Sequence, residues 1–334
     1  MLIGDVARRS GVSARMLRHY ESLGLLRPTG RTGAGYREYS GDDIRRIFHI
    51  ESLRSLGLPL RDVARALDDP GFTPSGLIEA LVRQTRERIA AETELLTRLQ
   101  RIGAAEPSDW EDVLRSVALL HALASEHAGK RQRAAMSAAD GGAVPVEALV
   151  EAALSETEPN VAGALHWALA QSGGAALALL EEGLGSPAAE VRRRAVQAVA
   201  KLPDPGATAL LKEALADSDI GVRRCAAPAL GARGAAEAVP TLTDMIADGV
   251  NDVEAADALG ALAGDPALAD GIAAGLVDRL GTDAVGPSAR LRLAQALADI
   301  PGSTASHALA DLSQDENRAV ALTAAYVLEL RDTR

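Results

Sequence analysis

The feature that most constrains the fold is a segment that recurs through the second half of the 334-residue chain. The clearest copies are EVRRRAVQAVAKL from Glu190, GVRRCAAPALGAR from Gly221, DVEAADALGALAG from Asp252 and RAVALTAAYVLEL from Arg318. Each copy follows a short apolar stretch of helical character, and the two best-matched copies begin about 31 residues apart. A single helical hairpin of this kind cannot bury its apolar side alone, so neighbouring copies are expected to stack on one another.

This repeated unit resembles HEAT or armadillo-type repeats, in which a helix pair is joined by an Asp-rich turn and the second helix reads V-R-x-x-A-x-x-A-L. About six units are expected between residues 145 and 331, the fifth being longer. The resemblance implies a curved superhelix and places the chain in the mainly α class. Aromatic residues are only 2% of the chain, so Ala, Leu and Val must supply most of the core. A compact helical bundle with accidental periodicity is the alternative.

Charge is distributed unevenly along the chain. The net charge is −11, yet residues 1–65 hold twelve Arg against seven acidic residues, whereas residues 145–334 hold 14 basic against 27 acidic residues. A basic N-terminal module on an otherwise acidic protein points to a polyanionic partner for that module. The acidic repeat region is not expected to share that partner.

The first 70 residues predict a helix-turn-helix followed by a hairpin. IGDVARRSGV and ARMLRHYESLGLL form the two helices, with Gly11 in the turn and Ser13 as the N-cap of the second helix. RPTGRTGAGYREYS then predicts a small hairpin, or wing. Ser40 with Asp42 or Asp43 is expected to cap the next helix, DDIRRIFHIESLRSLG, and RDVARAL forms a further short helix.

These motifs, in this order, resemble the winged helix-turn-helix DNA-binding domain of the MerR family of bacterial transcription regulators. The resemblance rests on MLRHYE, LGLLRP, GYREYS and LRSLGLPL, and it covers about residues 1–70. His19 is a departure, because many members carry a Tyr there. The resemblance implies a dimer that binds a pseudo-palindrome in double-stranded promoter DNA. It also implies that the dimer bends and undertwists this DNA so that RNA polymerase can use the promoter.

Ten residues are candidate DNA contacts. Arg15 and Arg18 are three positions apart and share one helix face, from which Arg side chains can bond phosphate or guanine in a bidentate manner. The resemblance adds Arg18 and Tyr20, the wing residues Tyr36 and Arg37, and a second-wing position at Arg54. Tyr20 packed into the core is the competing interpretation, and Tyr39 is expected to face inward. The full set is Ser13, Ala14, Arg15, Arg18, His19, Tyr20, Arg31, Tyr36, Arg37 and Arg54.

Residues 73–104 predict a long helix that pairs with a second copy in an antiparallel coiled coil, as the resemblance implies. The expected seam alternates steps of four and three and is formed by Ile78, Val82, Thr85, Ile89, Glu92, Leu96 and Leu99, with Leu81, Leu95 and Ile102 widening it. Thr85 and Glu92 interrupt the apolar stripe, which weakens the pairing but can set its register. A helix that packs on its own domain is the alternative.

The segment between this helix and the repeats is expected to be a helix, WEDVLRSVALLHALASEH, followed by a polar linker, GKRQRAAMSAADGGAVP. The predicted domains are therefore 1–72 for DNA binding, 73–104 for dimerisation, 105–144 as helix and linker, and 145–334 as the HEAT-like effector or interaction domain.

Several other functions find no support in the residues. The single cysteine, Cys225, excludes an internal disulfide and a thiolate metal cluster within one chain, and His121 and His127 lie on different helix faces. Asp217 and Asp219 are expected at a helix N-cap rather than in a catalytic pair. No catalytic triad or phosphate-binding loop is present, so no cofactor and no enzymatic activity are expected. The N-terminus lacks a signal peptide's apolar core, which favours the cytoplasm.

The leading functional hypothesis is a homodimeric transcription regulator whose repeat domain senses a ligand or a protein. The alternative is a DNA-tethered scaffold that uses the repeats to bind a partner protein. A third hypothesis, a helical-repeat DNA glycosylase, is opposed by the excess of 13 negative charges in residues 145–334.

Overall fold

The computed structural model describes residues 1–69, 73–139, 144–282 and 285–332. The chain divides into two units, Met1–Glu94 and Leu95–Arg334, with the boundary inside one long helix. Each unit has its own hydrophobic core. No helix in the described part of the chain combines the length and the apolar character that crossing a membrane requires.

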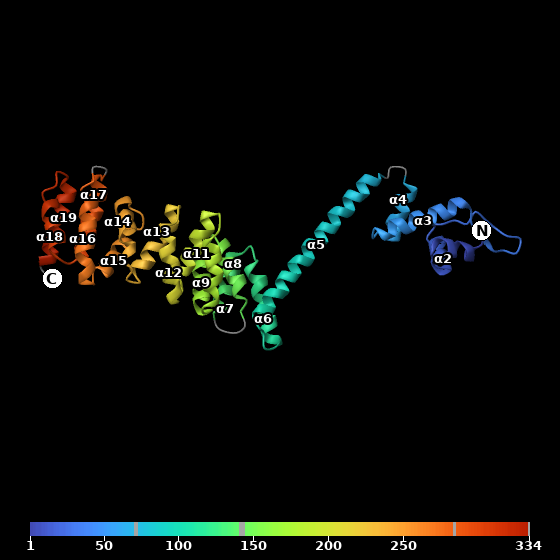
Figure 1. The fold of residues 1–334 in the computed structure, drawn as a ribbon, viewed down its shortest axis with the longest axis horizontal. Coiled ribbons are helices and arrows are strands. Elements are labelled where there is room, and N and C mark those ends of the chain that lie inside the picture. Colours follow the sequence, from blue (N-terminus) through green and yellow to red (C-terminus); the bar gives the residue numbers. More distant parts are fainter. Residues whose placement is uncertain (70–72, 140–143, 283–284, 333–334) are drawn as a thin grey trace. The chain divides into compact units, whose positions relative to one another are not determined.

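The N-terminal unit is a helix-turn-helix followed by a two-stranded hairpin and three further helices (Figure 1). Its elements are α1 (Ile3–Ser10), α2 (Ala14–Ser22), β1 (Gly30–Arg31), β2 (Arg37–Glu38), α3 (Gly41–Ser55), α4 (Leu60–Asp68) and the first part of α5 (Pro74–Ala104). The antiparallel strands pair Gly30 with Glu38 and Arg31 with Arg37. The predicted helix-turn-helix and wing are therefore confirmed.

Local signals in the sequence set these boundaries. Gly11 ends α1 with φ of +72°, a conformation that favours glycine, and Ser13 caps α2 by accepting from the Met16 backbone N–H. Ser40 and Asp43 form the reciprocal capping box of α3. The core beneath consists of Val6, Val12, Leu17, Tyr20, Leu25, Leu26, Tyr39, Ile47, Ile50, Leu58 and Val63.

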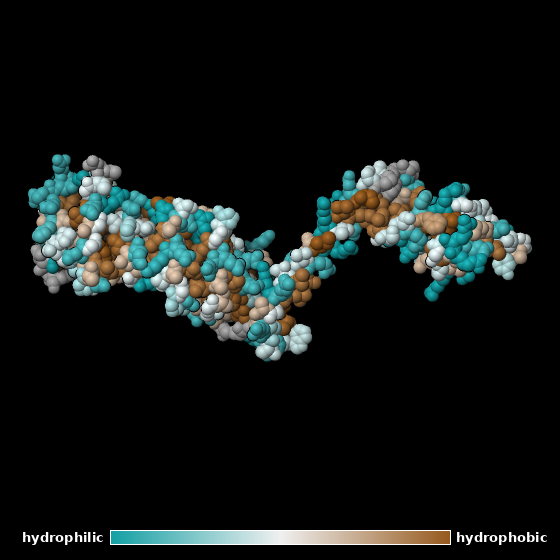
Figure 2. Space-filling model, viewed as in Figure 1, coloured by the Kyte–Doolittle hydropathy of each residue, from teal (hydrophilic) through white to brown (hydrophobic). Residues whose placement is uncertain are grey.

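Helix α5 carries an apolar stripe that remains exposed within one chain. Of the predicted seam, Ile78, Val82, Ile89, Leu96 and Leu99 are 43–60% exposed, and Thr85 and Glu92 are also exposed. Figure 2 shows hydrophobic side chains along this helix. Two of the expected flanking residues are used within the chain, since Leu81 packs partly against the N-terminal core and Ile102 is buried.

The expected linker is wrong in large part, because Ala128–Ala138 forms a helix, α7. It packs against α6 (Trp110–Leu123) and against α9 (Pro159–Gln171), and Ala134 and Ala135 are buried. The charged sequence KRQR is typical of a linker, but the contact is made by a narrow face of alanines on the same helix. Small residues allow close helix packing, so an Ala face suffices where a longer apolar stripe is absent.

The C-terminal unit continues as six helix pairs among the described residues, which confirms the predicted repeats (Figure 1). The first helices are α8 (Val146–Ser155), α10 (Ala175–Leu184), α12 (Pro205–Ala214), α14 (Val239–Asp248), α16 (Pro266–Leu280) and α18 (Ser303–Leu312). The second helices are α9 (Pro159–Gln171), α11 (Ala189–Lys201), α13 (Ile220–Gly231), α15 (Asp252–Leu262), α17 (Pro287–Ala296) and α19 (Arg318–Asp332). Two short 3₁₀ helices, η1 (Ala236–Ala238) and η2 (Leu297–Asp299), lie before α14 and after α17. The fifth pair is the longer one, since α16 has 15 residues against ten in the other first helices.

Arginines at one position of the second helix tie successive pairs together. Arg192 donates to both carboxylate oxygens of Asp217, 25 residues ahead, at 2.7 and 2.9 Å, and to the carbonyls of Ser186 and Pro187 behind it. Asp219 caps α13, as predicted.

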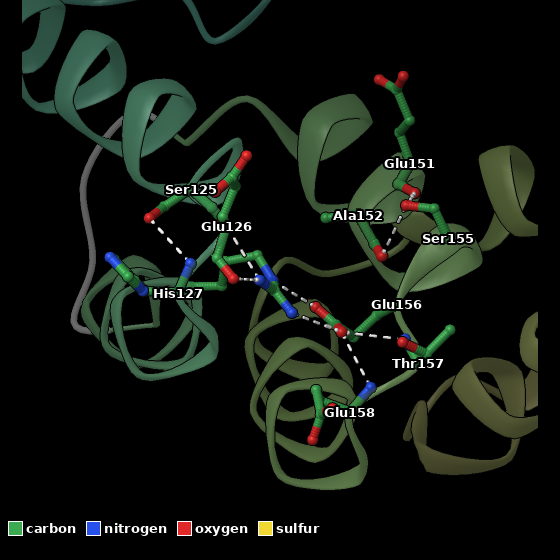
Figure 3. Close-up of polar contacts among 10 residues, drawn as sticks. Ser125, Glu126, His127, Glu151, Ala152, Ser155, Glu156, Thr157 and Glu158 are labelled. Carbon is green, nitrogen blue, oxygen red and sulfur yellow. Dashed lines mark hydrogen bonds and ion pairs between the residues drawn. The ribbon is translucent and has the colours of Figure 1, made fainter.

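Arg131 of α7 repeats this arrangement. It donates to both oxygens of Glu156, again 25 residues ahead, and to the carbonyls of Ser125 and Glu126 (Figure 3). Helices α6 and α7 therefore form a seventh unit at the start of the array.

Candidate nucleic-acid interface

Two arginines of α2 lie exposed on the helix predicted to enter the major groove. Arg15 and Arg18 have no hydrogen-bond or ion-pair partner among the residues that the structure describes. Their separation of three positions places them on one face, and Leu17, between them, points into the core. The two guanidinium groups are therefore free to bond an external anion.

Arg18 shares a hollow with the wing. Arg18, Tyr36 and Arg37 line a depression of about 380 Å³ together with Leu2, Ile3, Gly4, Asp5 and Gly35. Tyr36 is 66% exposed at the tip of the hairpin, where Gly35 adopts φ of +80° and allows the tight turn. The wing is held against the chain start because Met1 and Tyr39 exchange backbone hydrogen bonds of 2.9 Å. The structure thus brings three of the predicted residues together.

Arg37 is oriented by an internal carboxylate. Its Nε donates to both oxygens of Glu21, at 2.9 and 2.6 Å, which links the wing to α2. The ion pair leaves the two terminal guanidinium nitrogens without a partner among the described residues. A phosphate contact by Arg37 would use these terminal nitrogens.

Tyr20, one of the candidate DNA contacts, lies in the core instead, as its competing interpretation has it. Its side chain is fully buried in the core, and its hydroxyl donates to Glu51 and accepts from Arg54. Burial, reinforced by the Glu51 carboxylate, raises the pKa of Tyr20 to about 12. A neutral phenol that accepts from the Arg54 guanidinium positions this arginine, whose carbon Cζ lies 5.9 Å from the ring centre.

The other candidate DNA-contact residues differ in exposure and in the hydrogen bonds that their side chains form within the chain. Arg31 and His19 are exposed, and Ala14 is half-buried. The Ser13 oxygen accepts from the Met16 N–H in capping α2, and its hydroxyl proton stays available to donate outward. Tyr39 is buried, as expected, and burial raises the pKa of its hydroxyl.

The positioning residues Glu21 and Glu51 were not predicted from the sequence. Each lies on a helix of the domain and orients a candidate arginine, Arg37 and Arg54 respectively. Glu51 and Arg54 are three apart on one helix, which is a signal for an ion pair. Glu21 is 16 residues from Arg37, and no local pattern reveals that contact.

Two parts of the chain are similar to known proteins. Residues 1–69 match the MerR HTH family regulatory proteins, and residues 177–263 match HEAT repeats. The chain is 43% identical over 97 residues to the HTH-type transcriptional regulator SkgA of Caulobacter vibrioides, which is 29% of this chain and 36% of that protein. It is 41% identical over 103 residues to the HTH-type transcriptional activator TipA of Streptomyces coelicolor, or 31% of this chain and 38% of that protein.

The matched stretch thus spans little more than a third of these two relatives. Among solved structures, the N-terminal part of MtaN, the Bacillus subtilis multidrug transporter activator, is 31% identical. The match covers 30% of this chain and 95% of that one, with a TM-score of 0.30.

Proposed function

We propose that this chain, which carries a MerR-type helix-turn-helix domain at residues 1–69 and HEAT repeats at 177–263, is a homodimeric transcription regulator that binds promoter DNA. The observation that carries the proposal is the pair of exposed arginines, Arg15 and Arg18, without internal partners on the helix that this fold presents to DNA. Such side chains neutralise phosphates and bond guanine edges.

The wing would add backbone contacts beside the groove. Tyr36 and Arg37 line the same hollow as Arg18, so one phosphate path can reach all three. Arg54, held by Tyr20 and Glu51, would supply a second contact from the far end of α3. Bending a short duplex costs on the order of 1–6 kcal/mol, and contacts on both sides of the deformed centre would offset this cost.

Dimerisation would use the exposed stripe of α5. Ile89, Leu96 and Leu99 are 55–60% exposed, which a soluble helix avoids unless a partner covers the stripe. A second copy pairing antiparallel along this seam would place two DNA-binding domains on one pseudo-palindrome. RNA polymerase would then meet the realigned promoter, and the repeats would receive the regulatory signal.

A mobility-shift titration of the full chain against the duplex upstream of its own coding region tests the proposal. Arg18→Ala should weaken binding by about 1–3 kcal/mol, because it removes a groove contact. Arg37→Ala should lower the slope of log K against log salt by about one unit, because it removes one phosphate contact. Nuclease protection on the same duplex would locate the operator.

Arg318→Ala is the matched control, because Arg318 is an exposed arginine of the repeat array without a partner among the described residues. It should bind DNA as the unmodified chain does. Wild-type affinity and salt slope in both the Arg18 and Arg37 variants would contradict the assigned interface. Failure of the unmodified chain to bind any duplex at low salt would contradict the function.

A further inference from the structure

A hollow between α6 and α7 differs in charge from the acidic array that it begins. It has a volume of about 610 Å³, within the range of small-molecule sites. Its floor is apolar, formed by residues such as Leu119, Ala122, Ala134 and Ala138. Lys130, Arg133, Arg115 and His121 also line it, and no carboxylate does among the residues that the structure describes.

Two of these cations have no internal counter-ion. Lys130 and Arg133 lie three positions apart on α7, and neither has a hydrogen-bond or ion-pair partner in the described part of the chain. Arg115, on α6, is offset by Asp112 at 3.4 Å and Glu111 at 3.8 Å. The excess positive charge in the hollow therefore comes from α7.

A second hollow provides a contrast. About 660 Å³ lie between α14 and α16, yet Asp244 and Asp278 line that space, and Asp244 holds Arg279 at 3.1 Å. It has no unpaired cation among its described lining residues. Of these two hollows in the described part of the repeat array, the α6–α7 hollow is the one that combines an apolar floor with cations whose charge is not already balanced.

We propose that the α6–α7 hollow binds a small organic anion with an apolar body, and that this anion is the signal that the regulator senses. The apolar body would lie on the alanine and leucine floor, and the acidic group would meet Lys130 and Arg133. The sensing role, though not the binding itself, rests on the proposed function.

The hollow is also joined to the end of α5. The connection between α5 and α6 is only residues 105–109, Arg101 of α5 forms an ion pair with Glu151 of α8, and Ile102 is buried. Helix α7 in turn is tied to the turn between α8 and α9 through Arg131 and Glu156, the C-cap residue of α8. A ligand wedged between α6 and α7 would therefore act on the last turns of the proposed dimerisation helix.

Fluorescence titration of the full chain with 1-anilinonaphthalene-8-sulfonate tests the site. N-phenyl-1-naphthylamine, which has the same rings without the sulfonate, is the matched uncharged probe. Replacing both Lys130→Ala and Arg133→Ala should weaken binding of the anionic probe at least about tenfold, because two charge-assisted contacts are lost. Binding of the uncharged probe should change by less than about twofold, and Arg318→Ala should alter neither.

Ser137→Phe gives an independent check, because Ser137 lines the hollow at an exposed position where a ring can fill the space without disturbing the core. Both probes should lose affinity. Unchanged binding of both probes in this variant, or of the anionic probe in the double variant, would overturn the site.

The role in sensing is tested by repeating the mobility shift with the anionic probe present. A change in operator affinity that disappears in the double variant would support it. Probe binding at the hollow without any change in operator affinity would overturn the sensing role. Absence of duplex binding in every condition would instead defeat the proposed function and leave the anion site standing.

Discussion

The ion pair between Arg131 and Glu156 is expected to contribute stability that depends on pH. Glu156 is 5% exposed and accepts from Arg131 at 2.7 and 2.9 Å and from the backbone N–H groups of Thr157 and Glu158 (Figure 3). The Arg131 hydrogen bonds, followed by those two backbone groups, hold the pKa of Glu156 at about 2, against an ordinary 4.5. Glu156→Gln removes this charge while keeping an acceptor for the backbone.

The magnitude follows from the shift. Lowering the pKa from 4.5 to about 2 corresponds to about 3 kcal/mol of stabilisation, and solvent screening at Arg131, whose side chain is 19% exposed, reduces this to about 2 kcal/mol. Because the pKa is lower in the folded state, this stabilisation is fully present above about pH 4.5. It is lost as the pH falls toward about 2, where the folded carboxylate is also protonated.

Tryptophan fluorescence during urea unfolding reports this region selectively. The chain has two Trp residues, Trp110 in α6 and Trp167 in α9, on either side of the pair. We expect Glu156→Gln to lower the free energy of unfolding by about 2 kcal/mol near pH 7 and by less than about 1 kcal/mol near pH 3. Glu181→Gln, at an exposed position of α10 with no ion-pair partner in the described chain, is the control and should change stability by less than about 0.5 kcal/mol.

An equal loss of stability at both pH values would refute the reasoning, since the cost would then come from packing rather than from charge. A loss near pH 7 as small as that of the control would show that the pair does not stabilise the array.

Three further outcomes are expected. Burial, followed by the charge of Lys201, lowers the pKa of His166 to about 4. The free energy of unfolding should therefore fall as the pH drops from about 6.5 to 4, because the unfolded state takes up a proton that the folded state does not. His166→Gln should remove that pH dependence in urea titrations. Ile89→Lys should convert the dimer to a monomer in sedimentation velocity, and a dimer that persists would exclude the proposed seam. Tyr20→Phe should lower thermal stability by about 1 kcal/mol, because it leaves Glu51 and Arg54 without the hydroxyl, and an unchanged transition would show that this bond contributes nothing.

The parts of the fold that the sequence predicts are those determined by short-range patterns. Ser13 and the Ser40 and Asp43 pair are recognisable caps because each side-chain oxygen and the backbone N–H that it accepts from lie only three positions apart. The six helix pairs are predictable because each repeats the same apolar spacing. Both signals lie within one turn or one repeat.

The errors concern contacts between residues far apart in the chain. Tyr20 follows Arg18 and His19, and nothing local shows that its hydroxyl meets Glu51, 31 residues ahead, inside the core. A separation of 16 residues likewise hides the orientation of Arg37 by Glu21. Side-chain direction at an interface therefore depends on a tertiary partner that periodicity does not identify.

One signal in the printed sequence did extend to α7. A serine precedes the arginine by six positions in both cases, Ser125 before Arg131 and Ser186 before Arg192, and each arginine meets a carboxylate 25 residues ahead. Aligning the repeats on these polar positions, rather than on the apolar ones, predicts that α6 and α7 form a repeat unit, although the polar composition of α7 is typical of a linker. In a solenoid whose helices are rich in Ala, the polar contacts of the turns identify a repeat better than its hydrophobic stripe.

The position of the α6–α7 unit, between α5 and the other repeats, determines how ligand binding in the repeats can affect α5. A long flexible linker would let the repeats bind a partner without moving α5, which suits a tethered scaffold. Instead α6 and α7 form a packed pair directly after α5, and the ion pairs Arg101–Glu151 and Arg131–Glu156 connect the end of α5 and α7 to the next pair. Because each repeat contacts mainly its neighbours, a change in the first pair is transmitted to what adjoins it, and here one neighbour is the proposed dimerisation helix. This connectivity favours the regulator hypothesis, in which the first helix pair receives the signal, over the hypothesis of a DNA-tethered scaffold.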